Sequence, residues 1–308
     1  MSLAAPTTTA LELVVSSVTD AAGRPTNEDA ILVAELPAAS DPADAGYVLA
    51  VADGMGGLEG GEVASKLAID LLGDLFARER PTDIALALKQ AYRRANEAIY
   101  AESQKSGDAS QMGTTLVSAV IHGKYVTIAN VGDSRAYLMR ANQLTQITID
   151  HSLVNDQVKD GRISADQARR SPQRNILTHA LGAEPQLDRR LPSIFELDLL
   201  PEDRLLLCSD GFYDVMQQQD YLDVLGGADT ADSARQLSAI AQKRGTSDNV
   251  SAIVVAVKPS QATVQRAQIG AELAEQRSSA GGFNSILIPA IVLLIVIVAI
   301  AVGIYFYM

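Results

Sequence analysis

The chain has 308 residues, a formal net charge of −12 and 47% hydrophobic residues. Its acidity, with no basic run, excludes binding to a phosphate backbone, so we expect no nucleic-acid partner. Cys208 is the only cysteine, which excludes an intramolecular disulfide, and its place in an apolar run predicts a buried, inert thiol. The three histidines show no ligand spacing with one another or with Cys208, which argues against a zinc site.

Four segments are expected along the chain. Residues 1–10 have no basic region and no apolar core, so they form a flexible N-terminus and not a signal peptide. Residues 11–258 form one folded domain, and residues 259–284, rich in Ala, Gln, Ser and Gly, form a flexible linker. Residues 285–308 carry no charged side chain and are long enough to cross a bilayer as a helix. We therefore expect a single-pass protein of the cytoplasmic membrane, with its folded domain facing the cytoplasm.

Hydrophobic periodicity predicts the elements of the folded domain in chain order. The strands are expected at 11–18, 30–36, 47–52, 114–121, 125–131, 136–139, 144–147, 194–197, 204–209 and 249–258. Helices are expected at 62–80, from 82 or 83 to about 106, and around 231–244. The polar segment 150–182 is expected to be mostly helical, with a capping box at Ser164 and Gln167. Strands in consecutive runs and helices in pairs favour an α+β fold with antiparallel sheets.

Three of the apolar runs end in an aspartate beside a glycine, and these aspartates are Asp53, Asp133 and Asp210. A fourth, Asp248, comes just before the last apolar run. A carboxylate at the end of a core strand is held by the sheet but still reaches solvent. Several carboxylates held in this way can form an oxygen-rich site for a hard divalent cation, which points to metal-assisted chemistry.

The loop after the first strand holds an arginine close to two acidic residues, Arg24, Glu28 and Asp29. A guanidinium group is suited to bidentate binding of phosphate. Taken alone, such a loop is more often a surface cluster of ion pairs, so its meaning depends on the other motifs.

The motifs form an ordered set of six blocks, each of which is weak by itself. They are Arg24-x-x-Asn27-Glu28-Asp29, Asp53-Gly54-Met55-Gly56-Gly57 with Gly61-Glu62-x-Ala64-Ser65, Met112-Gly113-Thr114-Thr115, Gly132-Asp133-Ser134-Arg135, Ser209-Asp210-Gly211 and Asp248-Asn249. In these blocks, their order and their spacing, residues 11–258 resemble the metal-dependent protein serine/threonine phosphatases of type 2C in their bacterial form.

The resemblance implies an α-β-β-α sandwich of two antiparallel sheets flanked by helix pairs, with two Mn²⁺ or Mg²⁺ ions per domain. It implies that Asp53 bridges both metals and that Gly54 offers its carbonyl group. The same residue match implies that Asp210 and Asp248 complete the metal coordination. It places Glu28 and Asp29 close by, partly through water. It also implies a weaker third metal site at Asp133 and Asp210. Arg24 is the residue implied to hold the substrate phosphate, so Arg24 and Asp53 are the catalytic candidates.

The activity implied is hydrolysis of phosphoserine and phosphothreonine in proteins by a metal-activated water, without a covalent enzyme intermediate. Segment 150–182 matches the family's flap beside the active site, and we predict that it gates or selects substrates. Membrane-bound serine/threonine kinases and their phosphorylated targets are the expected partners. A catalytically inactive adaptor that binds phosphoproteins, and a phosphatase of small molecules, are the alternatives; the presence of every metal carboxylate disfavours the adaptor.

Overall fold

A computed structural model of the whole chain describes residues 11–36, 46–56, 60–105, 112–227 and 230–259. The chain divides into two units, residues 1–259 and 260–308. The predicted N-terminal segment, nearly all of the linker and the predicted membrane span lie outside the described residues. Within the described part of the chain, no helix is both long and apolar enough to cross a bilayer.

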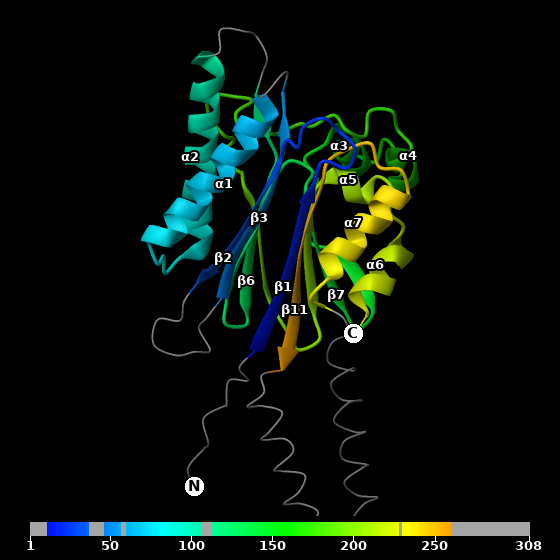
Figure 1. Ribbon diagram of the computed structural model, residues 1–308. Helices are drawn as coiled ribbons and strands as arrows, with labels where there is room; N and C mark the ends of the chain where they lie inside the picture. Colours follow the sequence, from blue (N-terminus) through cyan, green and yellow to red (C-terminus); the bar gives the residue numbers. More distant parts are fainter. Residues whose placement is uncertain (1–10, 37–45, 57–59, 106–111, 228–229, 260–308) are drawn as a thin grey trace, which may run out of the picture. The chain divides into compact units, whose positions relative to one another are not determined.

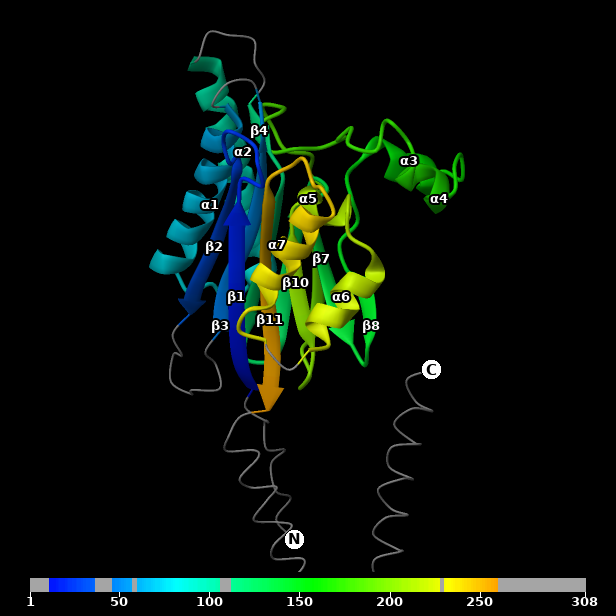
Figure 2. The same cartoon turned by 45° about the vertical axis from the view of Figure 1, so that its right-hand side comes forward.

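Two antiparallel sheets form the centre of the first unit (Figures 1 and 2). One sheet has the order β1 (Leu11–Asp20), β11 (Val250–Pro259), β10 (Arg204–Cys208), β7 (Arg135–Arg140) and β8 (Gln143–Gln146). The other has the order β2 (Asp29–Leu36), β3 (Gly46–Met55), β5 (Leu116–His122), β6 (Tyr125–Val131) and β9 (Ser193–Asp198), and the short β4 (Gly113–Thr114) pairs with β3.

Helices cover the outer face of each sheet (Figure 1). The sheet containing β3 is covered by α1 (Gly60–Arg78) and α2 (Ile84–Lys105). The sheet containing β11 is covered by α5 (Asp210–Tyr213), α6 (Gln218–Leu225) and α7 (Ser233–Lys243). Two further helices, α3 (Leu153–Lys159) and α4 (Ala165–Arg169), stand apart from the sheets in Figure 2. The α-β-β-α sandwich with antiparallel sheets is therefore confirmed for the described residues.

Three apolar layers hold the sandwich together. The middle layer lies between the sheets and includes Val51, Leu207 and Val255, all fully buried. One outer layer packs the apolar faces of α1 and α2 on the sheet containing β3, and there the hydroxyl groups of Tyr92 and Ser118 share a hydrogen bond. The other outer layer packs α5, α6 and α7 on the sheet containing β11. Burial of such side chains is the main stabilising contribution to folding.

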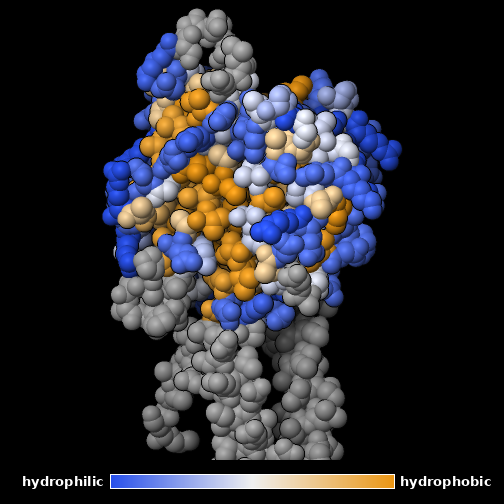
Figure 3. Space-filling model, in the orientation of Figure 1, coloured by the Kyte–Doolittle hydropathy of each residue, from blue (hydrophilic) through white to orange (hydrophobic). Residues whose placement is uncertain are grey.

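The first strands of the two sheets, β1 and β2, both lie at sheet edges on one side of the sandwich. Leu13, Val15 and Ile31 of these strands pack against the middle layer but are only half-buried. Figure 3 shows a band of apolar surface running down this side of the molecule. The middle layer is thus open along one edge.

Segment 150–182 differs from its prediction. Only α3 and α4 are helical, and the residues from 170 to 182 have no regular helix, so the expectation of a mostly helical segment is wrong in part. The capping box at Ser164 and Gln167 is present at the start of α4. Most helical stability in proteins comes from packing an apolar face on a core, and this segment offers little of it, since α3 buries Val154 and the short α4 buries no residue. The short elements β4, α5 and α6 were not predicted, because each is shorter than a clear periodic pattern.

Candidate active site

The predicted metal carboxylates come together at one end of the sandwich, where several strands begin or end. Asp29 at the start of β2 lies directly opposite Asp53 near the end of β3. The Asp53 carboxyl group also experiences the negative charges of Asp133, Asp210 and Asp248. Five carboxylates from five separate segments therefore form one acidic cluster.

Burial and mutual repulsion raise the pKa of these carboxyl groups. Burial raises the pKa of Asp29 to about 7 and that of Asp133 to about 7, and the neighbouring Asp210 adds to both shifts. Burial, followed by the nearby Asp248, raises the pKa of Asp210 to about 6. The pKa of Asp53 is raised well above its ordinary value, first by burial and then by Asp29. The protein by itself does not neutralise the cluster, so a bound cation would relieve the repulsion.

Hydrogen bonds hold the backbone and side chains of the acidic cluster in place. The Asp53 N–H donates to Thr115 Oγ1 at 3.0 Å, and Thr114 Oγ1 donates to the Asp53 carbonyl at 2.9 Å. The Ser209 hydroxyl donates to Asp29 Oδ2 at 2.9 Å, which joins the two sheets beneath the cluster. These contacts fix the strand ends that carry the cluster.

Arg24, the predicted phosphate-binding residue, lies at the rim of the acidic cluster. Its guanidinium group forms an ion pair with Asp248 at 2.7 Å and a second contact at 2.8 Å, and its Nε donates to the Ser247 carbonyl at 3.0 Å. The Arg24 side chain is 40% exposed, so it is accessible from solvent. In this structure Arg24 therefore balances the charge of Asp248.

Gly54 and Glu28 are packed backbone to backbone beside the cluster. The Gly54 N–H donates to the Glu28 carbonyl at 3.1 Å. A Cβ atom added at Gly54 would lie 2.1 Å from the Gly61 carbonyl oxygen and 2.5 Å from that of Glu28, so only glycine fits. Burial raises the pKa of Glu28, and Arg24 opposes that shift.

The donor set of the acidic cluster fits a hard divalent cation. Carboxylate oxygens are the ligands that Mg²⁺ and Mn²⁺ prefer. Asp210 Oδ1 is buried and has no hydrogen-bond partner, and such an orphaned acceptor is costly unless a cation or water satisfies it. Among the described residues, no three acidic, histidine or cysteine side chains are already arranged around a single point as ligands of one ion.

Comparison with known sequences identifies the family of this chain. Residues 16–250 match the family model of Protein phosphatase 2C. The chain belongs to the protein phosphatase 2C family. The serine/threonine protein phosphatase PstP of Mycobacterium tuberculosis is 39% identical over 211 residues, which cover 68% of this chain and 40% of PstP. The serine/threonine phosphatase stp of Listeria welshimeri is 36% identical over 213 residues, which cover 68% of this chain and 83% of stp.

Solved structures of serine/threonine phosphatases share this fold. The crystal structure of PstP from Mycobacterium tuberculosis has a TM-score of 0.71 and 35% identity, covering 80% of this chain and 99% of that one. A structure of the PstP catalytic domain in complex with two manganese ions has a TM-score of 0.69 and 34% identity, with coverage of 80% and 99%. This chain spans about two fifths of the full length of PstP, so the alignment concerns the PstP catalytic domain.

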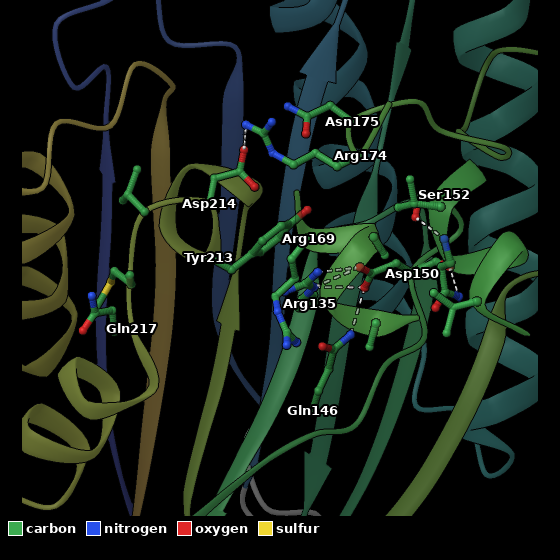
Figure 4. Close-up of a pocket in the computed structure, with 17 residues that line it drawn as sticks. Arg135, Gln146, Asp150, Ser152, Arg169, Arg174, Asn175, Tyr213, Asp214 and Gln217 are labelled. Carbon is green, nitrogen blue, oxygen red and sulfur yellow. Dashed lines mark hydrogen bonds and ion pairs between the residues drawn. The ribbon is translucent and has the colours of Figure 1, made fainter. Parts of the chain in front are cut away.

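A pocket of about 500 Å³ separates the flap from the rest of the phosphatase 2C domain (Figure 4). Arg174 of the flap and Asp214 after α5 form an ion pair across it at 3.1 Å. Arg135 donates to both carboxylate oxygens of Asp150 and lies 3.5 Å from the ring centroid of Tyr213. Tyr213 lines the pocket and hydrogen-bonds Asp133, so the pocket borders the acidic cluster.

Three polar residues that support the cluster had no predicted role. Asn249 Oδ1 accepts from the Glu28 N–H at 2.9 Å, and its Nδ2 donates to the carbonyls of Ala21 and Thr26, which closes the Arg24 loop. Thr115 joins Asp53 to the turn that carries Asp133, and His151 contacts the same turn. Asn249 and Thr115 lie inside the motif blocks, so the sequence marked them as part of the site, but it did not reveal their hydrogen-bond partners, which are distant in sequence.

Cys208 is buried and its pKa is raised to about 12 by burial, which agrees with an inert thiol.

Proposed function

We propose that this chain is a protein serine/threonine phosphatase that hydrolyses phosphoserine and phosphothreonine with two Mn²⁺ or Mg²⁺ ions. The observation that carries the proposal is the acidic cluster, in which Asp53, Asp133, Asp210 and Asp248 leave four segments and meet at one end of the two sheets. Membership of the protein phosphatase 2C family and the two manganese ions of the PstP catalytic domain support it.

In this proposal Asp53, Asp210, Asp248 and the Gly54 carbonyl hold the two metals, with Glu28 and Asp29 nearby. Asp133, together with Asp210, holds a weaker third ion. The metals, when bound, supply Lewis acidity that activates water and stabilises negative charge on the phosphoryl oxygens. The catalytic side chain that contacts substrate is Arg24.

Arg24 has to change partners for this role. It now pairs with Asp248, which the proposal assigns to a metal. If the Asp248 carboxylate held a cation, the guanidinium group would lose its anionic partner and could donate two parallel N–H groups to a substrate phosphate. The 40% exposure of Arg24 gives the phosphate a route of approach from solvent.

The decisive experiment measures phosphate release from a phosphothreonine peptide by the purified chain, with Mn²⁺ and with a chelator. Asp210→Asn removes one metal carboxylate, and Asp74→Asn on the exposed face of α1 is the matched control. We expect activity that requires metal, survives Asp74→Asn and falls at least a hundredfold in Asp210→Asn.

Parallel assays with nucleotides and sugar phosphates separate the alternatives. Faster turnover of a free nucleotide than of the peptide would favour a small-molecule phosphatase. A folded protein that binds the phosphopeptide but releases no phosphate with any divalent metal would favour the inactive adaptor.

We also propose that residues 285–308 anchor the folded domain, residues 11–258, to the cytoplasmic membrane through the linker at 259–284. The 24 uncharged residues of this segment support the proposal, since about 20 apolar residues cross a bilayer. Tethering would raise the local concentration of the phosphatase near membrane-bound serine/threonine kinases, the partners we propose. A chain truncated after Pro259 that stays in the membrane fraction would contradict this anchor.

A further inference from the structure

The flap leaves and rejoins the domain through a narrow neck, which we define as residues 150–153 and 176–179. The Thr178 N–H donates to the His151 carbonyl at 2.9 Å, and the Leu153 N–H donates to the Ile176 carbonyl at 2.9 Å. Ser152 and Leu177 form an isolated antiparallel bridge between these contacts. These contacts therefore join the two halves of the neck.

His151 joins the neck to the turn that carries Asp133. The His151 N–H donates to the Gly132 carbonyl at 2.9 Å, and the Gly132 N–H donates to His151 Nδ1 at 3.1 Å. The two residues thus form a reciprocal pair of hydrogen bonds, one of which depends on the imidazole side chain. Asp133 is the next residue after Gly132, so the side chain of His151 contacts the backbone that orients a metal carboxylate.

The hydrogen bonds determine the tautomer of His151. Because Nδ1 accepts from Gly132, it carries no proton, so the proton is on Nε2 and faces Ser193 Oγ at 3.1 Å. Burial and the neighbouring His179 lower the pKa of His151 to about 4, which keeps the ring neutral at physiological pH. The imidazole is therefore held between β9 and the Gly132 turn.

The Gly132 turn is tight and is connected to Asp53. Gly132 has φ +99°, and a Cβ atom there would lie 2.6 Å from the Thr115 side chain. The hydroxyl groups of Ser134 and Thr115 lie 2.7 Å apart, and Thr115 Oγ1 accepts from the Asp53 N–H. Hydrogen bonds and the backbone of residues 132–134 therefore connect the flap neck through the turn to the centre of the acidic cluster.

We infer that His151 is a positioning residue that couples the flap to the metal centre, because its Nδ1 fixes the Gly132 turn and thereby the direction of the Asp133 carboxylate. This inference rests on the proposed function, in which Asp133 holds the weaker third ion and the flap meets the substrate. Loss of the Nδ1 acceptor leaves the Gly132 N–H without its partner, and only the backbone hydrogen bond from the His151 N–H to the Gly132 carbonyl still joins the neck to the turn.

Two conservative substitutions separate the two contacts of His151. In His151→Asn the side-chain oxygen is as many bonds from the backbone as Nδ1, so it can still accept from Gly132. In His151→Gln the terminal atoms are as many bonds away as Nε2, so they reach Ser193 instead. Ser193→Ala removes the Ser193 contact and leaves Nδ1 in place, and His151→Ala removes both contacts.

The first measurement is calorimetric titration of Mn²⁺ into each full-length variant without substrate. We expect His151→Gln and His151→Ala to weaken the lowest-affinity Mn²⁺ site by about five- to tenfold, the range expected for one buried hydrogen bond. His151→Asn and Ser193→Ala should stay within about twofold of the original chain. Hydrogen exchange at Gly132, in metal-free protein, should accelerate in the same two variants that lose affinity.

Kinetics on a phosphothreonine peptide provide a second readout. His151→Gln should lower kcat at subsaturating Mn²⁺, and His151→Asn should restore it, whereas a purely structural role would lower the melting temperature of both variants alike. Equal Mn²⁺ affinity and equal Gly132 exchange in the Asn and Gln variants would overturn the inference. A chain that binds Mn²⁺ but releases no phosphate would refute the proposed function, and the titration would still decide the role of His151.

Discussion

The acidic cluster and the flap are neighbours but are built in opposite ways. The cluster lies on strand ends whose side chains Val51, Leu207 and Ile253 are fully buried. In the flap, α3 has Val154 as its buried residue and α4 has none. A pocket of about 500 Å³ lies between the flap and the rest of the domain. Repelling charges need a rigid frame, whereas a surface that meets varied substrates can be loosely packed.

The largest expected effect is on the acidic cluster, the rigid one of the two regions. Asp53→Asn removes a carboxylate proposed to hold the metals, and we expect kcat on a phosphothreonine peptide to fall on the order of a thousandfold. The same change removes a buried charge from a repelling cluster, so metal-free Asp53→Asn should melt at a higher temperature than the original chain. If Asp53→Asn lowered both the activity and the melting temperature of the metal-free protein, the charge of Asp53 would not destabilise the fold as we expect.

Hydrogen exchange measures the contrast between the two regions directly. Amides of β3, β6 and β10 should exchange roughly a hundredfold or more slowly than those of α3 and α4, because few apolar contacts resist opening of the flap. Mass spectrometry of the metal-free chain resolves both regions. Flap exchange as slow as that of the core strands would show that the flap is not a separate mobile unit.

The pH dependence of stability should be dominated by the acidic cluster. Asp29 and Asp133 titrate near 7 and Asp210 near 6 in the folded chain, against 3.8 as the ordinary value. The folded state therefore binds more protons than the unfolded state, and metal-free protein should gain stability as pH falls from about 7 to 4. His151, lowered from 6.5 to about 4, opposes this trend because the folded state then binds fewer protons, but it is one group against three.

Thermal unfolding with a chelator at pH 5 and at pH 7.5 tests this prediction. The metal-free chain should melt at a higher temperature at pH 5. Added Mn²⁺ should raise the melting temperature at pH 7.5 and reduce the difference between the two values, since a bound cation replaces the missing protons. A metal-free chain that melts lower at pH 5 would show that the cluster does not control stability.

Tyr92 tests the packing between α2 and the sheet containing β3 separately from the acidic cluster. Its buried hydroxyl lies 2.8 Å from the Ala129 carbonyl, 3.2 Å from that of Leu116 and 2.9 Å from Ser118 Oγ. Tyr92→Phe should lower the free energy of unfolding by about 1–3 kcal/mol and leave kcat unchanged. Tyr100→Phe, at a half-buried position on the same helix, is the matched control and should have a smaller effect. A large loss of kcat in Tyr92→Phe would link α2 to the site.

The smallest effect is expected on the flap surface. Arg169 lines the pocket and forms an ion pair with Asp166, and both side chains are more than 70% exposed. Arg169→Ala should change the free energy of unfolding by less than about 0.5 kcal/mol, as is usual for an exposed pair. If the flap selects substrates, KM for a peptide should rise by about two- to threefold with kcat unchanged. A loss of stability above this limit would mean that α4 supports the fold.

Much of this molecule could be predicted from local sequence patterns. The spacing of apolar residues in α1 and α2 and the apolar runs of β3, β6 and β10 are long enough to determine element type, and all of them were predicted. The short elements β4, α5 and α6 were missed because they depend on packing partners. The flap was misjudged for the same reason, since capping residues alone do not make a segment helical without a core to pack on.

The sequence by itself indicated four members of the acidic cluster, Asp53, Asp133, Asp210 and Asp248, because each lies at one end of an apolar run that predicts a strand. The fifth member, Asp29, was implied only by the resemblance to the type 2C phosphatases. Only the tertiary structure decided how those residues are held. The ion pair of Arg24 with Asp248, the closure of the Arg24 loop by Asn249 and the contact of His151 with Gly132 join residues 19 to 228 positions apart. Hydrogen bonds of this kind depend on distances and angles that a linear pattern does not contain, so they became visible only in the folded chain.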